Sequence, residues 1–273
     1  EEGFELLKSG KYEEAVECYD EVLDINPNFA PAYANKGVAL LALTDDDSNY
    51  EDYESAIVCF DRAIEINPND SGSLFNKGRA IQELAQFESD SPMQEQRLHE
   101  EALECFDKAV KINPVDARAN FAKALALIDL GRLEESIKCM DDALKIEPDN
   151  VIFLDFKGLT LVKLGKLTES IECFDKILEI NPKDTRALYN KGTSLSEHVN
   201  PYDGSSYAKS KAEEAIECFE KVLEIDPNDA RALFNKGTAC ILVDRNEEAT
   251  TCLEKAVKID PTLLERNQLS KDE

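Results

Sequence analysis

Tryptophan is absent from this chain of 273 residues, and histidine and methionine occur only twice each. No apolar run is long enough to cross a bilayer, and no secretory leader is recognisable. The histidines, His99 and His198, stand beside no motif that would supply a nucleophile or a proton-transfer partner. Phosphate-binding loops and dinucleotide fingerprints are also missing. We therefore expect no enzyme, and no catalytic residue, cofactor or metal ion.

Positive charge is scarce as well. Lysine and arginine number 31 against 57 aspartates and glutamates, so the net charge is −26. A field of that sign repels phosphate backbones and anionic lipids, and we expect neither a nucleic-acid nor a membrane partner. The acidic excess fits a solvated outer face that keeps the protein in solution, and the alternative is a surface that selects basic partners.

What the sequence does contain is one pattern repeated seven times. Each copy ends at a proline, and successive prolines are separated by 41, 46, 34, 34, 45 and 34 residues. The basic repeat is therefore 34 residues long, and three repeats carry insertions, at 44–53, 85–99 and 197–211. Such a period is typical of an array of similar supersecondary units. The prolines are Pro27, Pro68, Pro114, Pro148, Pro182, Pro227 and Pro261.

Each repeat predicts two helices. Nine residues before the proline there is always a cysteine, eight before it a bulky residue, and twelve before it a small one. These three share one stripe of an amphipathic helix, which we call helix B and which the proline ends. The first half of each repeat, such as 230–242, has the same period and predicts helix A.

One helix-A position is glycine in every repeat except the fourth, where it is alanine. Glycine inside a helix costs roughly 1 kcal/mol relative to alanine, so its regular use predicts close backbone contact with another helix. The residues at this position are Gly3, Gly37, Gly78, Ala124, Gly158, Gly192 and Gly237.

Cysteine usage is regular too, since seven of the eight cysteines occupy the helix-B position and no Cys-x-x-Cys pair occurs. Equivalent positions in neighbouring helix pairs lie roughly 10 Å apart, beyond the roughly 7 Å reach of a disulfide. We interpret these thiols, and that of Cys240 on a helix A, as small core side chains. Free thiols in this number favour a reducing compartment, so we expect a cytoplasmic protein.

These features closely resemble the tetratricopeptide repeat (TPR), a helix pair of 34 residues with small residues, a bulky residue and a proline at matching positions. The sequences Asn-Lys-Gly and Glu-Ala-Ile-Glu-Cys-Phe are most similar to those of arrays from archaea and bacteria. The resemblance implies an all-α fold: a right-handed superhelical solenoid of about seven helix-turn-helix repeats in a single domain over 1–273, with helix A on the concave side. The expected repeats are 1–29, 30–70, 71–116, 117–150, 151–184, 185–229 and 230–263, followed by a short cap or tail at 264–273.

The resemblance also implies a non-enzymatic protein–protein interaction scaffold that binds a peptide or a partner helix in the concave groove. Asparagine donates and accepts hydrogen bonds at once, so a row of asparagines suits the main chain of an extended peptide; alternatively, each merely bonds the neighbouring helix. Carrying the groove positions of the family over to this chain gives Asn35, Asn76, Phe75, Arg79, Arg118, Phe121, Ile128, Ile152, Leu159, Arg186, Tyr189, Asn190, Arg231, Phe234 and Asn235.

The asparagine row is interrupted by Ala122 and Phe156, which predicts an apolar anchor pocket at the fourth and fifth repeats. The carboxylate clamp by which some family members bind acidic chaperone tails is not matched. Around Asn190, the preceding repeat offers Asp155 and Leu159 where the clamp needs lysine and asparagine. Recognition of such a tail is therefore not expected.

The ends and the insertions allow further surfaces. Solenoids normally need polar caps, so open apolar ends would favour a structural protein that assembles end to end, as an oligomer or filament. The insertions all fall between helix A and helix B and would enlarge one edge, as a second contact surface or through neutral drift. Residues 94–105 are expected to extend helix B of the third repeat towards its N-terminus. The candidate end contacts are Phe4, Leu7, Leu263, Leu264 and Leu269.

Overall fold

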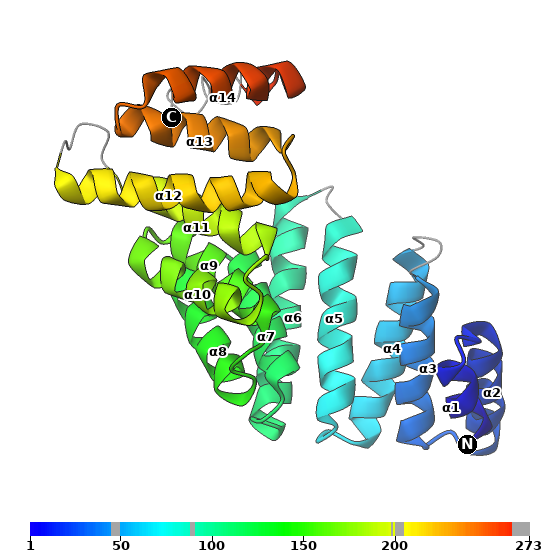
Figure 1. Cartoon of the computed structure of the whole chain (residues 1–273). Coiled ribbons are helices and arrows are strands. Elements are labelled where there is room, and N and C mark those ends of the chain that lie inside the picture. Colours follow the sequence, from blue (N-terminus) through cyan, green and yellow to red (C-terminus); the bar gives the residue numbers. More distant parts are fainter. Residues whose placement is uncertain (45–49, 88–90, 198, 200–204, 264–273) are drawn as a thin grey trace. The chain divides into compact units, whose positions relative to one another are not determined.

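The computed structural model of the protein describes residues 1–44, 50–87, 91–197, 199 and 205–263 (Figure 1). These residues form fourteen helices, and no strand occurs among them, which confirms the all-α class. From the second repeat on, each odd-numbered helix is a helix A and begins at the first residue of a predicted repeat. These first residues are Ala30, Ser71, Ala117, Val151, Thr185 and Ala230.

The first compact unit, Glu1–Pro148, contains four helix pairs. The two helices of each pair pack against each other, and α2, α4 and α6 also pack against helix A of the next pair in this unit. The helices are α1 (Glu2–Lys8), α2 (Tyr12–Ile25), α3 (Ala30–Leu43), α4 (Tyr50–Ile66), α5 (Ser71–Phe87), α6 (Pro92–Ile112), α7 (Ala117–Asp129) and α8 (Leu133–Ile146).

The second compact unit, Asp149–Glu273, contains three helix pairs with the same packing order. Asn150 caps the first of its helices, because its side chain accepts hydrogen bonds from the backbone N–H groups of Ile152 and Phe153. The helices are α9 (Val151–Lys163), α10 (Leu167–Ile180), α11 (Thr185–Glu197), α12 (Ser206–Ile225), α13 (Ala230–Leu242) and α14 (Asn246–Ile259).

The helix-A glycine lies against the bulky helix-B side chain of its own repeat. A Cβ built on Gly78 would lie 2.7 Å from Cε1 of Phe106, and one on Gly158 would lie 2.7 Å from Cε1 of Phe174. Each glycine therefore lies in close contact with helix B of its repeat, as predicted, and the nearest atoms belong to an aromatic ring. In the fourth repeat the same two positions hold Ala124 and Met140, both fully buried.

The insertions lengthen helices. α6 has 21 residues and α12 has 20, whereas α8, in a repeat without an insertion, has 14 (Figure 1). The predicted backward extension of helix B over 94–105 is confirmed by α6. Parts of all three insertions, with His198 among them, lie outside the described residues, and their use as a contact surface stays a prediction.

The cysteines line the helix pairs as free thiols. Six are buried, and Cys18 and Cys139 are half-buried. Burial raises the pKa of the Cys105 thiol to about 11, although the nearby Lys77 ammonium works to lower it. The buried thiols are therefore small, protonated core side chains. In the described part of the chain, no helix is both long and apolar enough to cross a membrane.

Candidate functional site

The structure leaves all fifteen predicted groove residues at least partly open to solvent. Ten of them are half-buried, including the four asparagines. Five are exposed: Arg79, Arg118, Ile152, Arg186 and Arg231. Seven belong to the first compact unit and eight to the second, and we call the faces that carry them the helix-A faces.

In the first unit, a cavity of about 280 Å³ opens between α3 and α5. It brings two predicted residues, Asn76 and Arg79, together with apolar side chains of α3. Glu83, which was not predicted, lies one turn after Arg79 on α5, and that spacing of four residues was the signal that could have found it. This volume is just below the roughly 300–1,000 Å³ of typical ligand pockets and leaves room for one bulky side chain. Its lining is Val38, Leu41, Ala42, Thr44, Tyr53, Asn76, Arg79 and Glu83.

Phe75 and Arg118 join neighbouring repeats of the same unit. The centroid of the Phe75 ring lies 6.1 Å from that of Phe106, and the Arg118 guanidinium lies 5.5 Å from the centroid of Phe75. A cation at this distance is attracted by the ring's π-electrons. Arg118 Nε also lies 3.6 Å from Asp116 Oδ1, so this arginine is held by an aromatic ring and a carboxylate.

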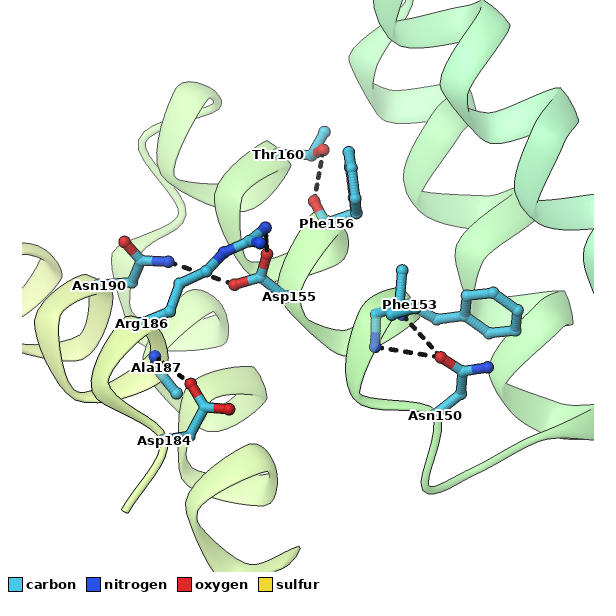
Figure 2. Close-up of polar contacts among 10 residues, drawn as sticks. Asn150, Phe153, Asp155, Phe156, Thr160, Asp184, Arg186, Ala187 and Asn190 are labelled. Atoms are coloured by element: carbon cyan, nitrogen blue, oxygen red, sulfur yellow. Dashed lines mark hydrogen bonds and ion pairs between the residues drawn. The ribbon is translucent and has the colours of Figure 1, made fainter. Parts of the chain in front are cut away.

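In the second unit, Asp155 gathers two predicted groove residues. Arg186 Nη2 donates to Asp155 Oδ2, and Asn190 Nδ2 donates to Asp155 Oδ1 at 3.2 Å (Figure 2). Asp155 is only 5% exposed. Burial raises the pKa of its carboxyl group, even though the Arg186 charge and both hydrogen bonds work to lower it.

Asp155 was missed as a groove residue in the sequence, although a signal was present. It occupies the helix-A position that holds an aromatic residue in the third, fourth, sixth and seventh repeats. These aromatic residues are Phe75, Phe121, Tyr189 and Phe234. An acidic residue at a position that is aromatic in four other repeats indicates that this position makes a different contact in the fifth repeat.

The asparagines of the second unit bond the preceding helix pair. Besides the contact of Asn190 with Asp155, Asn235 Nδ2 donates to the Tyr189 hydroxyl at 3.0 Å. These contacts favour the interpretation that such asparagines join neighbouring helices. A ladder of asparagines along a peptide main chain stays a prediction, and so does the apolar anchor at the fourth and fifth repeats.

A column of lysine–carboxylate pairs links successive repeats and was also missed. In each pair, the lysine directly precedes the helix-A glycine, or Ala124 in the fourth repeat, and reaches the acidic residue that follows the bulky helix-B residue of the preceding repeat. Burial works to lower the pKa of Lys77, but the hydrogen bond and charge of Asp61 outweigh it and raise that pKa. The repeated pairing of these two sequence positions was the available signal. The pairs are Lys36–Asp20 (2.5 Å), Lys77–Asp61 (2.8 Å), Lys123–Asp107 (2.5 Å), Lys191–Asp175 (2.5 Å) and Lys236–Glu220 (2.9 Å).

His99 is buried between two carboxylates of the first unit. Its Nδ1 lies 3.8 Å from Asp129 Oδ2 and its Nε2 lies 3.8 Å from Glu95 Oε1. The two carboxylates therefore face opposite nitrogens of the ring and cannot share one metal ion with it. Across the described ranges, no three histidine, cysteine, aspartate or glutamate side chains converge as metal ligands.

The candidate end contacts differ from one another. Phe4 is 46% exposed, with the Lys8 ammonium 4.3 Å from the centroid of its ring, and Leu7 packs partly buried in the first repeat. Leu263 is only 9% exposed and packs with Leu233 and Cys252. Leu263 thus covers its own repeat, as a cap would, and its use as an end contact stays a prediction. Leu264 and Leu269 lie outside the described residues.

Comparison with known families gives matches along most of the chain. A model described as TPR repeat matches residues 3–43 and 206–240. Three models described as tetratricopeptide repeat match 94–151, 59–90, and the set 30–70, 153–184 and 230–263.

Three solved structures show the same fold. YrrB, described as a TPR protein with an unusual peptide-binding site, is 19% identical with a TM-score of 0.62, and the match covers 80% of this chain and 97% of YrrB. PilF of Pseudomonas aeruginosa is 17% identical with a TM-score of 0.60, covering 89% and 97%. TTC0263, a thermophilic TPR protein of Thermus thermophilus, is 21% identical with a TM-score of 0.53, covering 71% and 95%. At these identities the likeness extends to the fold alone.

Proposed function

The chain belongs to the tetratricopeptide repeat family, and on that premise we propose that it is a non-enzymatic scaffold that binds a peptide or partner helix on its helix-A faces. The observation that carries this proposal is the cavity between α3 and α5. Apolar side chains of α3 suit an apolar anchor of the partner, and Asn76 and Arg79 supply hydrogen-bond donors beside it. The peptide-binding site named for YrrB supports the same use of a shared fold.

The composition of the cavity supports binding in preference to catalysis. Its lining holds one carboxylate, Glu83, and no histidine, cysteine or serine. Its hydroxyl groups belong to Tyr53 and to Thr44, which donates a hydrogen bond to the Leu41 carbonyl. The charge of −26 supports a protein partner over nucleic acid or an anionic membrane, and eight free thiols support a location in the cytoplasm.

Arg79 provides the test. Random twelve-residue peptides are selected on the immobilised full chain, and the affinity of each enriched peptide is measured by fluorescence anisotropy. Arg79→Ala is expected to weaken binding about tenfold, since one charge-assisted hydrogen bond is lost. The matched control is Arg62→Ala, which removes an arginine from helix B of the second repeat, where it forms an ion pair with Glu65 of the same helix. Failure to enrich any peptide, or equal loss in both variants, would refute the proposal.

End-to-end assembly into an oligomer or filament is the second candidate. Phe4 at 46% exposure and Ile25 at 86% exposure are apolar side chains left open on the first repeat, and open apolar surface at one end favours association. Light scattering after size exclusion over a concentration series decides the matter. A constant monomer mass refutes assembly, whereas a mass that rises with concentration and falls in Phe4→Ser supports it.

A further inference from the structure

In the second unit, the second residue of each helix A forms an exposed row. The row consists of Ile152 on α9, Arg186 on α11 and Arg231 on α13. Ile152 is 59% exposed, the Arg186 side chain is 62% exposed, and Arg231 is exposed. One apolar and two basic side chains thus follow one another at successive repeats, in a chain whose net charge is −26.

The two arginines are available in different ways. Arg186 is oriented by the buried Asp155 through one Nη group (Figure 2). Since a guanidinium carries five N–H donors, most of them remain for a ligand. Arg231 forms no ion pair with any residue in the described part of the chain. In the repeat before Arg231, the position equivalent to Asp155 holds Tyr189. Its hydroxyl already accepts a hydrogen bond from Asn235.

The acidic residues nearest in sequence to Arg186 and Arg231 are the caps of their helices. Asp184 Oδ1 accepts a hydrogen bond from the Ala187 backbone N–H at 2.9 Å, and Asp229 Oδ1 accepts one from Ala232 at the same distance. They cap α11 and α13 and so satisfy backbone donors. Arg186 and Arg231 are the second residues of these helices and lie in their first turns.

Spacing sets the form of the ligand. Neighbouring helices pack about 8–10 Å apart, and an extended chain advances about 3.3 Å per residue. Three residues of an extended peptide therefore span one repeat. A peptide that follows the row meets Ile152, Arg186 and Arg231 at intervals of about three residues.

We propose that this row binds an extended acidic peptide, with an apolar residue at Ile152 and carboxylates about three and six residues away at Arg186 and Arg231. Arginine suits this role because its planar fork pairs with a carboxylate through two hydrogen bonds. The net negative charge of the chain opposes any anionic ligand at long range. Close to the row the two arginines set the local field, because charges farther than about 8 Å are largely screened at physiological salt. The assignment rests on the proposed peptide-binding function and specifies its partner.

The test begins with random twelve-residue peptides selected on the full chain. Enriched sequences are expected to carry two acidic residues three apart, with an apolar residue three further along. Arg186→Gln and Arg231→Gln are each expected to weaken binding of those peptides about tenfold, and raised salt should weaken binding to the unsubstituted chain. The control is Arg245→Gln, because Arg245 lies in the turn before α14 and is paired with Glu213 and Glu248.

Arg231→Gln keeps the inference testable if Arg186→Gln disturbs the fold, because no buried carboxylate depends on Arg231. Circular dichroism and the unfolding midpoint identify a variant that does not fold. Phe234→Ala, which removes a half-buried aromatic side chain from the same helix-A face, separates the two proposals.

Peptides that lose affinity in Phe234→Ala but lack acidic residues, or are indifferent to both arginine variants, overturn this inference and leave the peptide-binding function standing. Enrichment of no peptide overturns both. Binding of a twenty-residue thymidine oligonucleotide that is lost in both arginine variants also overturns the inference, because the row would then be a phosphate site.

Discussion

Replacing Gly158 by alanine should destabilise the second unit, although alanine is the better helix former. The new Cβ would lie 2.7 Å from Cε1 and 2.8 Å from Cζ of Phe174. Phe174 is fully buried, so its ring has no open space to move into. Overpacking of this kind costs roughly 1–3 kcal/mol, and the gain in helix propensity returns up to about 1 kcal/mol. We expect a net loss of about 1 kcal/mol in the free energy of unfolding.

The fourth repeat shows how the contact can be relieved. There the glycine is Ala124 and the aromatic residue is Met140, and both are fully buried. Methionine is unbranched and adapts to irregular space. Adding Phe174→Met to Gly158→Ala should therefore cost less than the two single substitutions together, with a coupling of about 1 kcal/mol.

Urea unfolding followed by circular dichroism measures all four proteins of this cycle. Gly72→Ala is the control, because Gly72 is exposed near the start of α5 and its nearest neighbour, Asp70 Oδ1, is 3.3 Å from the added Cβ. We expect that variant to be neutral or slightly stabilised. A Gly158→Ala protein as stable as the unsubstituted chain, or additivity within about 0.3 kcal/mol, would refute the argument that the ring requires glycine.

Two further predictions concern the contacts between and within helix pairs. Lys77→Met should lower the free energy of unfolding by about 0.5–1.5 kcal/mol, because Lys77 is 15% exposed and loses its hydrogen bond to Asp61, whose side chain is 46% exposed and stays hydrated. Lys108→Met, at a lysine that is 61% exposed, should change it by less than about 0.5 kcal/mol in the same urea titration. The raised pKa of Cys105, about 11, predicts that its contribution to stability is fully present below about pH 8.5, where thiols ordinarily titrate, and is lost as the pH rises towards 11. The urea midpoint of the unsubstituted chain should therefore fall more steeply over this range than that of Cys105→Ala, and equal slopes would contradict the prediction.

The repeat pattern was readable because its causes are local. The proline that ends each helix B, the stripe of small, cysteine and bulky residues, and the glycine of helix A all act within a few turns of one helix. The position of each helix pair and the burial of its thiols follow from that stripe. Even the column of lysine–carboxylate pairs was present as two recurring sequence positions, since identical repeats bring identical partners together.

The tertiary structure alone decided which side chains of successive repeats meet. Helical periodicity places Asp155 and Arg186 on helix-A faces, but 31 residues separate them, and their pairing depends on how closely α9 and α11 pack. That packing buries Asp155, leaves Arg186 partly free and uses Asn190 as a donor to the neighbouring helix. In the same way, the sequence left open whether Leu263 covers the seventh repeat or stays exposed, and the structure packs it against Leu233 and Cys252. Sequence periodicity determined the faces of the helices, whereas contacts between residues far apart in the chain determined which groups on those faces remain open to a partner.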